Sequence, residues 1–162
     1  MSTVPDRQHP VKEVPPESAG RTPAGDAFSA LVARVFRLNG LLAAAGDALS
    51  RPAGQSSARW QVLAILEGEP ATVASIARVL GLARQSVQRI ADILEGEGLI
   101  RYVENPRHRR ARLAQLSAEG RIVLAAIQAA QRPWADRVGG AVGAPSLRRA
   151  TATLDALIAA LE

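Results

Sequence analysis

A helix-turn-helix pattern between Val73 and Asp92 constrains the fold of this chain more than any other stretch. Small Ala77 is followed four residues later by Gly81, and branched Val87 lies six residues beyond that glycine. Two short helices that cross around a tight turn need a small residue where they approach, a residue in the left-handed conformation at the turn, and an apolar residue in the angle between them. The spacing therefore predicts a helix-turn-helix. An ordinary helical corner with a solvated polar face is the alternative, because short patterns also match by chance.

The two helices of this pattern have an apolar side and a polar side. Helical spacing predicts that the apolar side faces the core, and its residues are Ile76, Leu80, Leu82, Ile90 and Leu94. The polar residues of the second helix are then left facing outward, and they are of the types that hydrogen-bond phosphates and base edges. These expected DNA contacts are Arg84, Gln85, Ser86, Gln88 and Arg89.

An arginine-rich β-hairpin is expected directly after the second helix. That helix should end near the glycines of residues 96–98, and residues 99–104 and 111–116 should form two strands around the turn signal Asn105-Pro106. A charge run is often only a solvated surface, but after a helix-turn-helix it can form a wing that lies along the DNA backbone or enters the minor groove. The hairpin contains five arginines and one glutamate, Glu104, so its local charge is +4. The arginines are Arg101, Arg107, Arg109, Arg110 and Arg112.

Four segments between residues 58 and 120 carry a resemblance to a known family. They are Ser75-Ile-Ala-Arg-Val-Leu-Gly-Leu, Gln85-Ser-Val-Gln-Arg-Ile-Ala-Asp-Ile-Leu-Glu-Gly-Glu-Gly-Leu-Ile-Arg, Asn105-Pro-Arg-His-Arg-Arg and Leu116-Ser-Ala-Glu-Gly120. In these segments the chain resembles the MarR family of bacterial winged-helix transcription regulators, and the flanking helices fit that family in size and order. The family's wing often has acidic residues at the positions of Asn105 and His108. This wing lacks them, so more arginine is left unpaired for DNA.

The composition permits one domain with a substantial core and excludes several kinds of site. Apolar residues make up 48% of the 162, but aromatics are only 3%, so aliphatic side chains must do most of the packing. The absence of cysteine excludes thiol redox sensing, disulfides and cysteine-based zinc sites. The two histidines, His9 and His108, lie far apart in sequence, so we expect no metal centre and no cofactor. The net charge of +5 suits an anionic partner without separating DNA from a membrane surface.

Residues 1–23 are expected to form a disordered arm before a single domain at residues 24–162. The arm contains five prolines and no periodic apolar pattern. A DNA contact by the arm is an alternative, but its acidic residues offset its basic ones. The arm lacks the apolar core of a secretory signal, and no apolar run approaches the roughly 20 residues of a membrane span. We therefore expect a cytoplasmic protein with no membrane partner.

Helices outside the winged helix are expected to form a dimerisation lobe from residues 24–50 and 117–162. The first helix, over residues 26–49, has a broad apolar stripe that needs a partner surface. The resemblance implies that terminal helices supply this surface by pairing two subunits, and packing within a single chain is the alternative. Ser117 should cap a helix over residues 118–132, Pro133 should kink or interrupt it, and residues 134–138 should resume it. Gly139-Gly140 should end it, and a last helix should cover residues 145–161.

The DNA-binding lobe is expected to span residues 57–116. A helix over residues 58–67, capped by Ser57, should precede the helix-turn-helix, and Thr72 should cap the latter. Trp60 in the earlier helix is either ordinary core or part of a ligand pocket beneath this lobe. The pocket residues would be Phe36, Arg59 and Trp60, and the ligand a small aromatic or phenolic effector.

These observations together predict a mainly α-helical protein with a small β-hairpin wing, a winged helix-turn-helix joined to a helical dimerisation lobe. We expect a homodimer that binds an inverted repeat in double-stranded DNA and represses transcription by occluding a promoter. The major groove should meet Gln85, Ser86, Gln88 and Arg89, Arg84 should contact phosphates or a base edge, and the wing contact should come from Arg107, Arg109 and Arg110.

Two other classes of function are alternatives to DNA binding. An enzyme is disfavoured, because no nucleophile-and-base pair of cysteine or histidine and no glycine-rich phosphate loop is present, and no catalytic residue is expected. A winged helix that binds only protein is the stronger alternative, and the Arg-rich wing argues against it.

Overall fold

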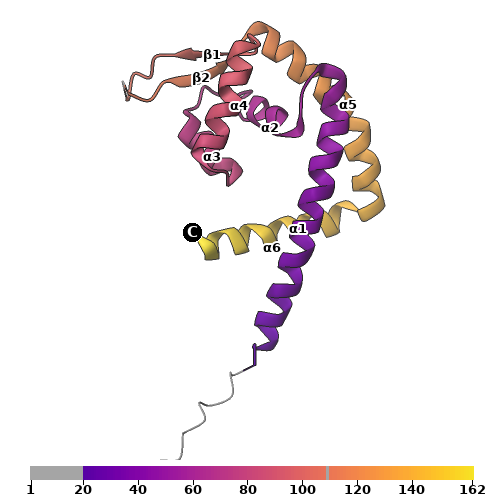
Figure 1. Ribbon diagram of the computed structural model, residues 1–162. Coiled ribbons are helices and arrows are strands. Elements are labelled where there is room, and N and C mark those ends of the chain that lie inside the picture. Colours follow the sequence, from indigo (N-terminus) through magenta and orange to yellow (C-terminus); the bar gives the residue numbers. More distant parts are fainter. Residues whose placement is uncertain (1–19, 109) are drawn as a thin grey trace, which may run out of the picture. The chain divides into compact units, whose positions relative to one another are not determined.

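The computed structural model describes residues 20–108 and 110–162, which form a mainly helical fold with one β-hairpin (Figure 1). This confirms the predicted fold class. Residues 1–19 of the predicted arm lie outside the described residues, and so does Arg109. Packing divides the chain after Leu38, so that residues 39–162 form one compact unit. The elements are α1 (Pro23–Ser50), η1 (Arg51–Ala53), α2 (Ser57–Ile65), α3 (Val73–Leu80), α4 (Arg84–Gly96), β1 (Ile100–Val103), β2 (Leu113–Leu116), α5 (Ala118–Val142) and α6 (Ala144–Leu161).

The helix-turn-helix consists of α3 and α4, as the sequence predicts. Thr72 caps α3 by accepting a hydrogen bond from the Ser75 amide at 3.1 Å, and Gly81 ends it with a φ of 63°. Val87 is fully buried in the angle between the helices. The prediction for Leu82 is wrong, because its side chain is 42% exposed. Leu82 follows the left-handed Gly81 and precedes α4, so helical spacing does not apply to it.

The hairpin is shorter than predicted but has the expected antiparallel pairing. Ile100 lies opposite Leu116 and Val103 opposite Leu113. Ala71, just before α3, adds a bridge to Ala114, with backbone hydrogen bonds of 3.0 and 2.8 Å. This bridge ties the base of the wing to the start of the helix-turn-helix. Figure 1 shows the hairpin extending beyond α3 and α4.

The core lies where α2, α3, α4, the hairpin and the start of α5 meet. Its fully enclosed side chains include Leu63, Ile76, Leu94 and Leu124, one from each of the four helices. Burying side chains of this size stabilises the fold by about 1.5 to 3 kcal/mol each. The core therefore fixes α4 and the wing as one body.

One close approach between α1 and α2 and one corrected cap complete this packing. The predicted cap Ser57 is instead the first residue of α2, and Ser56 caps the helix by accepting from the Arg59 amide at 3.3 Å. Ser57 donates its own amide to Asp47 Oδ1 at 2.7 Å and lies against Gly46 of α1. A side chain at Gly46 would collide with Ser57, so this glycine allows the C-terminal part of α1 to pack on α2.

The terminal helices differ in their bounds from the expectation. The first helix begins at Pro23, a favoured first position, after Thr22 accepts a hydrogen bond from the Gly25 amide at 3.1 Å. The helix α5 continues through Pro133 and both expected terminator glycines to Val142. One lost backbone donor in a 25-residue helix is tolerated here. The break comes at Gly143, whose φ of 87° favours glycine.

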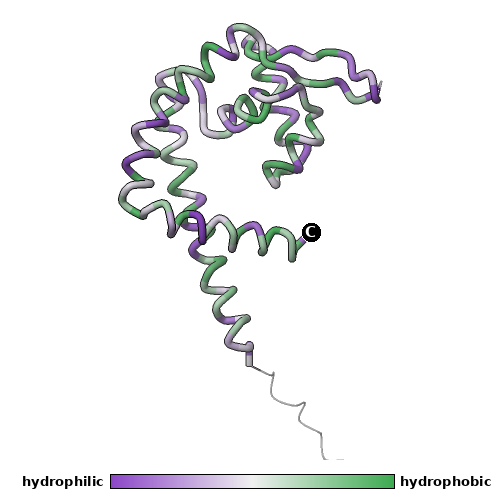
Figure 2. Tube along the Cα trace, turned by 180° about the vertical axis from the view of Figure 1, so that it is seen from behind, coloured by the Kyte–Doolittle hydropathy of each residue, from purple (hydrophilic) through white to green (hydrophobic). Residues whose placement is uncertain are grey.

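The last helix has no buried residue among the described residues, although it is rich in leucine. Figure 2 shows apolar residues recurring along α6 toward the C-terminus. Leu154 is 41% and Ile158 54% exposed, and Val142 at the end of α5 is 52% exposed. These apolar side chains remain exposed to solvent in the single chain.

Contrary to the expectation from sequence, the helix α1 is apolar enough and long enough to cross a membrane. Length and composition alone do not establish a membrane-spanning helix, because core helices of soluble proteins share both properties.

Candidate nucleic-acid interface

The outward face of α4 carries four of the five predicted contact residues. Val87, Ala91 and Leu94 are fully buried and fix the rotation of the helix on the core. The opposite face is exposed and consists of Arg84, Gln85, Ser86 and Arg89. Because the inner face is locked by packing, these side chains start from a defined position on a rigid helix. Such a helix is what major-groove readout requires.

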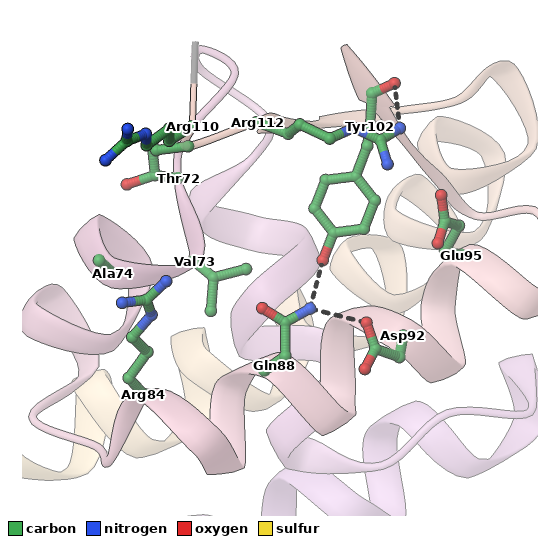
Figure 3. Close-up of a pocket in the computed structure, with 11 residues that line it drawn as sticks. Thr72, Val73, Ala74, Arg84, Gln88, Asp92, Glu95, Tyr102, Arg110 and Arg112 are labelled. Atoms are coloured by element: carbon green, nitrogen blue, oxygen red, sulfur yellow. Dashed lines mark hydrogen bonds between the residues drawn. The ribbon is translucent and has the colours of Figure 1, made fainter. Parts of the chain in front are cut away.

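Gln88 does not share this free position, because its amide is held by the protein (Figure 3). Its Nε2 donates to Asp92 Oδ1 at 2.7 Å and to Tyr102 Oη at 3.0 Å. Asp92 lies one turn further along α4, and this i to i+4 pair could have been read from the sequence. Tyr102 comes from β1, so its part in the site depends on tertiary packing and was missed.

Tyr102 is itself held by Arg112, which directly precedes the opposite strand β2. The Arg112 guanidinium donates to the Tyr102 carbonyl at 3.2 Å, and its carbon lies 4.8 Å from the ring centroid, a cation–π distance. Burial raises the pKa of the Tyr102 hydroxyl above its usual value of 10.0, and the hydrogen bond from Gln88 opposes this. Tyr102 therefore remains a neutral hydrogen-bonding group at physiological pH.

A recess of about 410 Å³ lies between α4, the start of α3 and the wing. Figure 3 shows Arg84 and Arg110 on one side of it and the Gln88, Asp92 and Tyr102 group on the other. The recess thus joins the helix and the wing in one surface of mixed charge. This continuity could not be predicted from the sequence.

The wing presents exposed arginines on a turn that Asn105 holds. The Asn105 side chain is 8% exposed, and its Oδ1 accepts from the Arg107 amide at 3.0 Å. It therefore shapes the turn where the resembled family often has an acid. Arg107 and Arg110 are exposed, and the described residues contain a single salt bridge, between Arg59 and Glu97. Within residues 20–108 and 110–162 the wing arginines are thus free of ion pairs.

The three predicted pocket residues are not brought together. Trp60 is half-buried and lines a recess of about 480 Å³ with residues of α5 and the end of α1, among them Gly46 and Trp134. Arg59 instead donates to Glu97 at 2.8 Å and is not part of this lining. Phe36 is 73% exposed and belongs to the other unit of the chain. Trp134 was missed, because the sequence places it 74 residues from Trp60.

Comparison with known proteins agrees with this architecture. The MarR family model matches residues 54–111. The uncharacterized protein Rv2011c of Mycobacterium tuberculosis is 38% identical over 137 residues, which cover 85% of this chain and 96% of that protein.

Solved structures of the same fold include one bound to DNA and one bound to a small molecule. The M. tuberculosis regulator MosR, solved in complex with DNA, superposes with a TM-score of 0.68 and 24% identity, covering 81% of this chain and 97% of MosR. CouR from Rhodococcus jostii RHA1, bound to p-coumaroyl-CoA, gives a TM-score of 0.70 and 22% identity, covering 82% of this chain and 92% of CouR. At these identities the likeness concerns the fold. Taken with the family match and the mycobacterial relative, it shows that this chain belongs to the MarR family, whose members are DNA-binding transcription regulators and not enzymes.

Proposed function

We propose that this protein is a repressor that binds an inverted-repeat operator as a homodimer, and that residues 57–116 form its DNA-reading lobe. The observation that supports this most is the exposed polar face of α4, carried on a helix whose inner face is fully buried. Arg89 and Gln85 are side-chain types that reach guanine and adenine in the major groove. MosR, which has this fold, was solved with DNA.

The wing supplies the sequence-independent part of the proposed binding. Arg107 and Arg110 are exposed and unpaired within the described residues, and we expect Arg109 to act with them. Each arginine that neutralises a phosphate releases condensed counterions and makes affinity depend on salt. A wing bound along the backbone or in the minor groove would thus position α4 for base readout.

Dimerisation is supported by apolar side chains that α6 and the end of α5 leave exposed. Leu154, Ile158 and Val142 are each more than two-fifths exposed in the single chain. Pairing through residues 24–50 and 117–162 would cover such side chains and set two copies of α4 about a two-fold axis. Two reading helices then match two half-sites about 10 to 11 base pairs apart. A dimer that covers a promoter excludes other proteins from it, so we expect repression and a cytoplasmic location.

An effector site is proposed at the recess lined by Trp60 and Trp134 rather than at the three residues named from sequence. The recess has an apolar wall and polar groups from Gln61, Gln128 and Gln131, the mixture typical of small-molecule sites. CouR, which shares the fold, was solved with p-coumaroyl-CoA. Two indoles in this recess favour an aromatic ligand, and we expect its binding to weaken DNA binding.

Selection of bound fragments from the source genome, followed by gel-shift titration, tests the proposal. We expect a shared inverted repeat and a shift that weakens steeply with salt. A protein that shifts no fragment at low salt would instead be a winged helix that binds only protein, and DNA binding by this chain would be refuted. Release by small aromatic acids, added to the same complex, tests the effector separately.

A further inference from the structure

We propose that Tyr102 and Asp92 fix the orientation of the Gln88 amide, so that Gln88 offers DNA only its carbonyl oxygen. Tyr102 is then a positioning residue for sequence specificity, although it belongs to the wing and not to the reading helix. The inference rests on the proposed function and names the chemistry that one residue of α4 can recognise.

Both hydrogen-bond donors of the Gln88 amide are already used within the protein. Nε2 carries two N–H groups, and it has two acceptors, Asp92 Oδ1 at 2.7 Å and Tyr102 Oη at 3.0 Å. The Asp92 carboxylate can only accept, so the atom facing it must be the amide nitrogen and not the oxygen. Within residues 20–108 and 110–162, no hydrogen bond reaches Gln88 Oε1, and that oxygen is not enclosed. Figure 3 shows it on the side of the amide away from Asp92 and Tyr102.

The tyrosine that completes this arrangement is not free to move away. Arg112 holds the Tyr102 carbonyl at 3.2 Å and covers its ring at 4.8 Å, and β1 is fixed by its pairing with β2. The chain of contacts therefore runs from Arg112 on the wing through Tyr102 to Gln88 and ends at Asp92 on α4. The Tyr102 hydroxyl is neutral at physiological pH, as its pKa lies above the ordinary 10.0, so it accepts from Gln88 without adding charge near DNA.

A fixed amide of this kind changes which bases Gln88 can read. Glutamine pairs with adenine in a bidentate way when it donates to N7 and accepts from N6. With its donors occupied, Gln88 can only accept, and in the major groove the groups that donate are the amino groups of cytosine and adenine. Guanine and thymine present acceptors there and would face the Gln88 oxygen unfavourably. Gln88 should thus favour cytosine or adenine over guanine or thymine, without contacting adenine N7.

The test compares base preferences of the wild-type protein, Tyr102→Phe and Gln88→Ala on the selected operator. Gln88→Ala identifies the base pair that Gln88 reads, because its preference at that position disappears. Tyr102→Phe keeps the ring and all charges but removes the hydroxyl that accepts from Nε2. We expect the preference for cytosine or adenine over guanine or thymine at that position to fall about fivefold, the worth of one net hydrogen bond of roughly 1 kcal/mol. Binding to scrambled DNA should not change.

Modified bases at the same position provide a second readout on the wild-type protein. In an operator with adenine there, replacing adenine by 7-deazaadenine should leave affinity within about twofold, because N7 is not contacted. Replacing it by purine, which lacks the amino group, should cost about fivefold. Equal losses with the two analogues would show bidentate pairing and overturn the inference.

A matched double-variant control separates this inference from a general effect on the wing. Gln88→Ala and Tyr102→Phe should be non-additive, whereas Gln85→Ala and Tyr102→Phe should be additive, because Gln85 makes no hydrogen bond to Tyr102 in the described structure. Additive effects for both pairs would overturn the positioning role while leaving DNA recognition by α4 intact. A wild-type protein with no base preference at any position would overturn the proposed function itself, and the inference with it.

Discussion

The salt dependence of DNA binding should report directly on the wing arginines. Arg107 and Arg110 are exposed and have no ion pair among the described residues, so their charge is available to phosphates. A two-fold dimer carries each arginine twice. Each phosphate contact contributes about 0.9 to the slope of log affinity against log salt, so Arg107→Ala, which removes two contacts from the dimer, should lower the slope by about 1.8. The double variant Arg107→Ala/Arg110→Ala should lower it by about 3.6.

The size of this effect makes it measurable by anisotropy titration of a labelled operator. Between about 50 and about 200 mM salt, a slope lower by about 1.8 means that the Arg107→Ala protein loses about twelvefold less affinity than the wild type. Scrambled DNA should show the same change in slope, because phosphates carry no sequence information.

Arg132→Ala is the matched control for the wing variants. It removes the same charge from an exposed position on α5, away from the wing, and its slope should equal that of the wild type. Wild-type slopes in both wing variants would refute the reasoning and remove the wing from the interface. A slope that fell equally in Arg132→Ala would show a general effect of net charge instead.

Three further predictions concern assembly, the turn and pH. Leu154→Asp should convert a dimer into a folded monomer in light scattering, because burying an unpaired carboxylate in an apolar interface costs several kcal/mol; a wild-type monomer at micromolar concentration contradicts the proposed dimer. Gly81→Ala should lower the free energy of unfolding by about 1 to 2 kcal/mol, because φ is positive at this residue. The control Gly96→Ala has as much space around the added methyl group but lies in a helix, so it should not lower the free energy of unfolding. Equal effects of the two variants in denaturant titrations contradict the role of the turn. The pKa of Tyr102 is raised in the folded protein, so the contribution of this group to stability is complete below pH 10.0 and is lost as pH rises through the higher folded value. The wild type should therefore lose more stability than Tyr102→Phe over that range, and parallel curves of unfolding free energy against pH contradict this.

The helix-turn-helix could be predicted from sequence because its determinants are local. Each determinant acts on residues close to it in sequence. The cap is Thr72, the left-handed residue that ends α3 is Gly81, and the side chain buried between the helices is Val87. The prediction fails at Leu82, where the residue lies between helices and periodicity has no meaning.

The internal contacts of the site could not be predicted in the same way. The bond between Gln88 and Tyr102 exists because the hairpin folds back beside α4, and local spacing carries no signal for that approach. The same holds for Trp60 and Trp134, which line one recess from α2 and α5. Pro133 shows the reverse, since its strong local signal for interrupting a helix is overridden within the long helix α5.

The central claim, that the outward face of α4 reads DNA sequence, is tested most directly by comparing two DNAs. Arg89 is exposed on α4, and Arg89→Ala should not disturb the core. Binding titrations on the selected operator should show a loss of about 1 to 3 kcal/mol for Arg89→Ala, with nearly unchanged binding to scrambled DNA of the same length. Equal losses on the two DNAs would mean that Arg89 only holds the phosphate backbone, and the recognition role assigned to α4 would be contradicted.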